Sequence, residues 1–137
     1  MGLSIKCKKT GTVYLLGYFG MFRLRSKVAE LFDREFMELY NDTYMYTGEK
    51  RENAYQKLKA YTCKKHPMPL KVLDFLLEPD CHYEITYGTC KLIHKQINGK
   101  CDDWVIGYAG QNNPFTWNQF VTLLEECQEN KSKLIWQ

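Results

Sequence analysis

The sequence predicts an α+β fold, and three features of the 137-residue chain support that prediction. Apolar and polar residues alternate near the N-terminus, which is typical of a half-buried strand. Further along, apolar residues recur at spacings of three and four, which indicates amphipathic helices. We find no internal repeat, low-complexity tract or linker, so residues 1–137 are expected to form a single domain.

The N-terminal residues predict a β-hairpin. Leu3 to Cys7 alternates in polarity, Gly11 suits the turn, and Val13 to Tyr18 is expected as the return strand. Short strands are also expected near 104–108 and 134–136, as candidates to join the hairpin. For 104–108, an ordered segment packed on the core is the alternative.

About five helices are expected to follow the hairpin. The longest runs from about Phe19 to Tyr40, where a broad apolar stripe marks it as the hub of the core. A second helix is expected over about 49–64. A short third helix is expected to begin at Pro69, and Pro79 forbids its continuation.

The last two helices are predicted from their end signals. Thr86 is expected to cap a helix that stops at Gly99, because a threonine oxygen accepts free backbone N–H groups and glycine favours a helix end. Asn113 as the N-cap and Pro114 in the first turn predict the start of the C-terminal helix.

The composition indicates an ordinary globular protein. Hydrophobic residues make up 45% and charged residues 26% of the chain. No apolar run approaches 18 residues, so no membrane span is expected. The N-terminus lacks the apolar centre of a secretion signal, which favours a cytoplasmic location. In that reducing compartment the six cysteines are expected to be free thiols.

The charge is unevenly divided along the chain. Residues 1–72 hold 14 basic and 7 acidic residues, a net +7, whereas residues 73–137 hold 5 and 9, a net −4. Such asymmetry favours an acidic partner or nucleic acid for the first half, or two oppositely charged faces that associate. The basic residues expected to make such contacts lie on the hairpin and at the start of the long helix: Lys6, Lys8, Lys9, Arg23, Arg25 and Lys27.

The stretch from Asp80 to Asn98 holds residue types that suit two kinds of metal site. Cys81, Cys90 and His94 are zinc-ligand types, but no close C-x-x-C or H-x-x-x-H pair is present. We therefore expect no metal, with Cys90 as a small core residue and His94 as a hydrogen-bonded residue at its edge.

The Asp80–Glu84 loop has a faint similarity to a calcium-binding loop, since acidic and polar side chains alternate there. A calcium loop needs glycine at its sharp turn and a closing glutamate. Tyr83 and Thr89 stand at those two positions. Whether this loop binds an ion is left open by the sequence.

Motifs for catalysis are missing. Gly17 to Gly20 has neither phosphate-loop nor dinucleotide-binding spacing, and no G-x-S-x-G motif occurs. A cysteine–histidine pair formed in space is the remaining enzyme hypothesis. The chain is therefore expected to work without a cofactor, and the sequence favours a non-catalytic role.

One resemblance concerns residues 73–137. An acidic residue and cysteine, a short polar loop, Glu84-Ile-Thr and a helix with Cys90 resemble a motif of small uncharacterised bacterial and phage-type proteins. His82 and Tyr83 depart from it where an acidic residue and glycine would stand. The later aromatic, glycine and cysteine positions fit the same resemblance: Gly107, Tyr108, Gly110, Trp117, Phe120 and Cys127. The resemblance implies a soluble bacterial protein but no known activity.

The leading hypothesis is a small intracellular module that binds or regulates another protein without catalysing a reaction. Aromatic residues anchor many protein interfaces. Trp104, Tyr108, Trp117 and Trp136 are therefore the candidates for exposed contacts, and burial in the core is the alternative for each. The alternative function is nucleic-acid binding through the basic N-terminal half.

Overall fold

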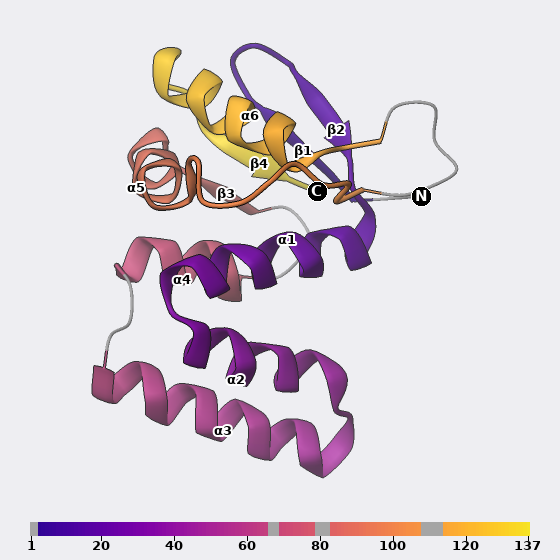
Figure 1. Cartoon of the computed structure of the whole chain (residues 1–137), viewed down its shortest axis with the longest axis vertical. Coiled ribbons are helices and arrows are strands. Elements are labelled where there is room, and N and C mark those ends of the chain that lie inside the picture. Colours follow the sequence, from indigo (N-terminus) through magenta and orange to yellow (C-terminus); the bar gives the residue numbers. More distant parts are fainter. Residues whose placement is uncertain (1–2, 66–68, 79–82, 108–113) are drawn as a thin grey trace.

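A computed structural model describes residues 3–65, 69–78, 83–107 and 114–137, which form four strands and six helices (Figure 1). The prediction of an α+β fold is confirmed. In chain order the elements are β1 (Ser4–Cys7), β2 (Val13–Leu15), α1 (Gly17–Phe32), α2 (Arg34–Met45), α3 (Gly48–Lys65), α4 (Leu70–Leu77), β3 (Tyr83–Ile85), α5 (Tyr87–Ile97), α6 (Trp117–Glu129) and β4 (Leu134–Trp136).

The four strands form one antiparallel sheet in the order β2-β1-β4-β3. The predicted N-terminal hairpin and the predicted strand near 134–136 are both confirmed. Ile5 is the central residue, because it pairs with Tyr14 of β2 on one side and with Trp136 of β4 on the other. β3 was not predicted as a strand, and it pairs with the far side of β4.

One face of this sheet is buried and the other faces solvent. Ile5 and Cys7 of β1 and Leu134 and Trp136 of β4 are completely buried. On the other face, Leu15 of β2 pairs with Ser4 of β1 and is half-exposed. This is the usual arrangement of an antiparallel sheet that packs its inner face on helices.

Figure 1 shows the molecule as a series of layers. The sheet lies at one end with α6 beside it, α1 and α4 lie in the middle, and the α2–α3 pair lies at the other end. The helix α3 is mostly exposed, and of its residues 48–64 only Ala54 and Leu58 are buried. Within the described residues, no helix has the length and apolar character needed to cross a membrane.

The single long helix expected from Phe19 to Tyr40 is wrong, because the chain breaks at Asp33. The backbone of Asp33 is extended, and its carboxylate accepts N–H groups from Glu35 and Phe36 as the N-cap of α2. The Tyr61 hydroxyl of α3 donates to the same carboxylate over 2.5 Å. Burial and this hydrogen bond raise the pKa of Tyr61. Asp33 therefore joins the start of α2 to the C-terminal part of α3.

The end signals of the last two helices had different outcomes. Thr86 caps α5 as predicted, since its hydroxyl accepts the N–H of Thr89, and Gly99 follows the helix with a positive φ of 71°. The N-cap of α6, however, is Thr116 rather than Asn113. Its side chain exchanges hydrogen bonds with Gln119 in a capping box, which fixes the helix start more firmly than a first-turn proline. Asn113 lies outside the described residues.

The segment near 104–108 does not join the sheet as a strand. Val105 forms a single bridge with Thr116, and the N–H groups of Ile106 and Gly107 both donate to the carbonyl of Phe115. β1 already has a strand on each side, so no central position is left for this segment. The described part, residues 104–107, is therefore the ordered segment that the sequence left as the alternative. Tyr108 lies outside the described residues.

Candidate functional site

Arg25, one of the six basic residues expected to contact an acidic partner, is buried. Only 4% of its surface is exposed. Its guanidinium carbon lies 5.8 Å from the ring centre of Phe75 and 5.3 Å from that of Trp136. Aromatic faces attract cations at such distances. The expectation that Arg25 belongs to an exposed basic surface is therefore corrected. Its side chain lies on the buried face of α1.

The other five basic residues do not share one surface. Lys8 and Lys9 lie at the hairpin turn, where the Lys9 N–H donates to Ser132 Oγ over 2.9 Å, and Lys6 lies on β1. The hairpin turn is at the end of the sheet far from α1, the helix that carries Arg23 and Lys27 (Figure 1). The structure thus divides the predicted patch between two parts of the molecule.

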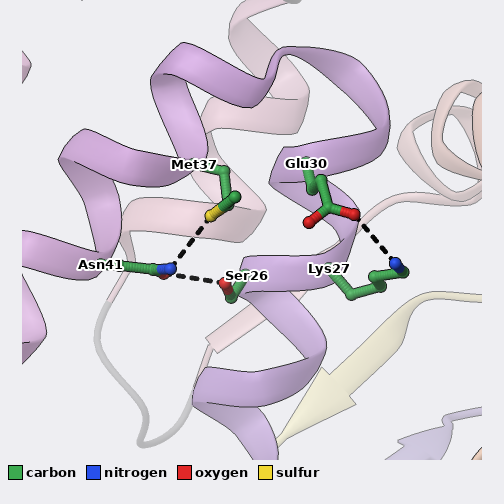
Figure 2. Close-up of polar contacts among 5 residues, drawn as sticks. All are labelled: Ser26, Lys27, Glu30, Met37 and Asn41. Carbon is green, nitrogen blue, oxygen red and sulfur yellow. Dashed lines mark hydrogen bonds and ion pairs between the residues drawn. The ribbon is translucent and has the colours of Figure 1, made fainter.

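Arg23 and Lys27 each have a neighbour of their own. The Arg23 guanidinium lies 4.9 Å from the ring centre of Trp104 and donates a long, 3.5 Å hydrogen bond to the carbonyl of Ile106. Lys27 Nζ lies 2.9 Å from Glu30 Oε1 (Figure 2). Glu30 offsets the charge of Lys27, whereas Arg23 stays exposed on an aromatic ring.

An exposed group of apolar side chains lies beside Arg23, where α1 begins and α2 ends. Phe22 stacks on Tyr44 with ring centres 3.8 Å apart, and Phe19 lies 6.3 Å from Phe22. Phe19 is 60% exposed, and Met45 after Tyr44 is 70% exposed. We call Phe19, Phe22, Tyr44 and Met45 the aromatic surface. Large exposed apolar groups that touch one another are uncommon on a surface without a binding role.

Polar contacts fix the two helices next to the aromatic surface. Ser26 of α1 donates to Asn41 Oδ1 of α2 over 2.8 Å, and Asn41 in turn donates to the sulfur of Met37 (Figure 2). Ser26 lies one turn after Phe22, and Asn41 lies one turn before Tyr44. The hydrogen bond therefore holds the register that stacks Phe22 on Tyr44.

The tryptophans expected as contact residues are mostly core residues. Trp117 and Trp136 have 1% and 0% of their surfaces exposed, so the alternative of burial holds for both. Trp104 is half-buried and stacks on Trp117 with ring centres 5.7 Å apart, and the Arg23 guanidinium also lies over its ring. The aromatic surface was missed because α1 and α2 were expected as one helix that ends at Tyr40, with Tyr44 and Met45 in the connection after it.

Of the zinc candidates, the structure describes Cys90 and His94, and these two have different surroundings. Cys90 is completely buried, whereas His94 Nε2 lies 2.9 Å from Glu125 Oε1 of α6. Cys81 lies outside the described residues. Among the residues that the structure describes, no group of three histidine, cysteine, aspartate or glutamate side chains has a geometry that holds a metal ion. The described part of the calcium candidate is Tyr83 and Glu84, and the Glu84 carboxylate pairs with Lys133 Nζ. This hydrogen bond and the cation lower the pKa of Glu84.

Three buried thiols meet between the sheet and the last two helices. Cys127 of α6 contacts Cys90 of α5 and Cys7 of β1, and all three are completely buried. The hydrogen bond with Cys90 and burial raise the pKa of Cys127. A thiol is reactive as the thiolate, so this environment keeps Cys127 protonated and inert.

We expect the cysteines to react with a thiol reagent at very different rates. Cys63 on α3 is exposed and should be modified within minutes. Cys7, Cys90 and Cys127 should react at least about a hundredfold more slowly, because they need local or global unfolding first. Peptide mass spectrometry after timed treatment of the native protein measures the rates. Modification of Cys127 at the rate of Cys63 would contradict the buried cluster.

No family model, no curated protein and no solved structure matches this chain. The resemblance of residues 73–137 to small bacterial and phage-type proteins therefore stays a prediction.

Proposed function

We propose that this chain is a small protein-interaction module without catalytic activity, which binds its partner through the aromatic surface. The observation that carries the proposal is the stack of Phe19, Phe22 and Tyr44, in which Phe22 is partly buried and the two outer rings are exposed. Aromatic and arginine side chains supply most of the binding energy at protein interfaces. A stack already formed in the free protein loses little side-chain freedom when a partner covers it.

The charges around the aromatic surface indicate the chemistry of the partner. Arg23 lies next to Phe22 in the sequence, and the exposed Arg51 lies near Tyr44 across the start of α3. Both arginines offer forked N–H groups that suit a carboxylate. The proposed partner is therefore a protein segment that presents apolar side chains flanked by aspartate or glutamate.

The experiment compares two double variants in a binding assay. Phe19→Ser with Met45→Ser removes apolar contacts from the aromatic surface, and both residues are exposed enough that no cavity forms. The matched control is Leu70→Ser with Tyr87→Ser, since both residues are also exposed and lie outside the aromatic surface. A protein retained from nuclease-treated lysate by the wild type and the control should be lost by the first variant.

Direct measurement with the purified partner then decides the proposal. Loss of two interface side chains is expected to raise the dissociation constant at least about a hundredfold, with no effect of the control pair. Equal binding by both variants would contradict a role for the aromatic surface.

A second candidate function is nucleic-acid binding, and α3 is the observation that favours it. Lys50, Lys57 and Lys64 are exposed and recur every seven residues, so they lie close to one face of this helix over about 21 Å. Phosphate groups attract such a row of cations. If the protein retards mixed DNA or RNA in gel electrophoresis, and this binding weakens steeply with salt, nucleic-acid binding would be favoured over protein interaction.

A further inference from the structure

A cavity of about 320 Å³ lies among residues of α1, α2, α3 and α4 and opens to solvent. Its volume falls in the range of small-molecule sites, and corresponds to about ten water molecules. Tyr40 and Tyr44 of α2 and Tyr55 of α3 line it together with two leucines of α4. The walls thus combine flat aromatic faces, hydroxyl groups and aliphatic carbon, which suits a planar organic ligand.

Arg25 places a positive charge in the wall of this cavity. Its guanidinium is held at the rings of Phe75 and Trp136, and it is 4% exposed. Contact with ring faces does not use the N–H groups, which point outward in the plane of the guanidinium. Because arginine has five such donors, it can bond a neighbouring side chain and a ligand oxygen at the same time.

The charges lining the cavity favour an anion. Arg51 from α3 adds a second cation, and its guanidinium carbon lies 5.6 Å from the ring centre of Tyr55. Glu78 at the end of α4 is the one acidic residue in the described lining, so two cations face one anion. Arg25 is buried, whereas Arg51 is exposed at the entrance. The exposed arginine can attract a charged ligand, and the buried one can then hold it.

We propose that this cavity binds a small organic anion, a planar body that carries a carboxylate or a phosphate group. The anionic group lies between Arg25 and Arg51, where forked N–H donors match two oxygens of either group. The planar body lies against the tyrosine rings and the leucines of α4. This site shares Tyr44 and Arg51 with the partner surface proposed above, whereas Arg25, Tyr55 and the leucines of α4 belong to the cavity alone.

The test uses benzoate and phenyl phosphate as probes, with phenol as the neutral control. Titrations of the full chain by calorimetry are expected to give a dissociation constant below about 1 mM for at least one of the anions. Phenol should bind at least about tenfold more weakly, because it lacks the charge-assisted hydrogen bonds. Preference between the two anions identifies the natural ligand as a carboxylate or as a phosphate ester.

Two arginine variants locate the site. Arg51→Gln removes the cation at the entrance and is expected to weaken binding of the preferred anion at least about tenfold. Arg34→Gln is the matched control, because Arg34 is an equally exposed arginine on α2 that does not line the cavity. Phe19→Ser should leave anion binding unchanged, so failure of the partner proposal and failure of this one are distinguishable.

Four results would overturn the proposal. The first three are the absence of binding by both anions at millimolar concentration, phenol binding as tightly as the anions, and wild-type affinity in Arg51→Gln. Equal weakening by Arg34→Gln and Arg51→Gln would show attraction to general surface charge, and would overturn it too.

Discussion

Replacing Trp136 with alanine is expected to lower the free energy of unfolding by about 3–5 kcal/mol. Trp136 is completely buried on β4, a strand with neighbours on both sides. Its ring meets Phe75 edge to face, with ring centres 5.5 Å apart, and also lies over the Arg25 guanidinium. The substitution therefore opens a cavity and removes the aromatic neighbour of a buried cation.

Chemical denaturation followed by circular dichroism measures this loss. Since domains of this size are stable by only about 5–15 kcal/mol, the variant should unfold at much lower denaturant, or fail to fold at all. Trp136→Phe retains an aromatic face and should cost clearly less. Leu70→Ala, at an exposed position of α4, should leave the midpoint nearly unchanged. A midpoint for Trp136→Ala close to that of Leu70→Ala would contradict the packing described above.

The fold was predictable where local patterns and long-range pairing agree. The hairpin, the α3 and α4 helices and the cap at Thr86 all follow from polarity patterns and end signals within a few residues. The break at Asp33 was missed because the apolar spacing continues through it, from α1 into α2. Its one local sign is Asp33 itself, because aspartate often caps a helix. The Tyr61 hydroxyl that also donates to this carboxylate comes from 28 residues later.

The candidate surfaces were less predictable because they depend on which helices meet. Arg25 looks like its neighbours Arg23 and Lys27 in the sequence, yet its position on α1 turns it toward Phe75 and Trp136. The stack of Phe22 on Tyr44 joins residues that were assigned to one helix and its following loop. The meeting of the three thiols likewise needs β1, α5 and α6 to be placed first.

The last prediction concerns Gly107, where residues after Trp104 press against the start of α1. A Cβ atom at Gly107 would lie 2.7 Å from the carbonyl oxygen of Leu15 and 3.0 Å from the Cβ of Phe115. The Leu15 oxygen belongs to the backbone, and Phe115 is completely buried. Neither atom can therefore move aside without a loss of packing energy. We expect Gly107→Ala to destabilise the protein by about 1–3 kcal/mol.

A second glycine supplies the matched control. Gly88 lies in the first turn of α5, where the nearest atom to an added Cβ is Thr86 Oγ1 at 3.7 Å. Because alanine favours a helix more than glycine, Gly88→Ala should stabilise the protein by about 0.5–1 kcal/mol. The same glycine-to-alanine change is therefore expected to lower the unfolding midpoint at Gly107 and to raise it at Gly88. Shifts of the same sign would show that residues 104–107 do not press against β2 and α1 as closely as described.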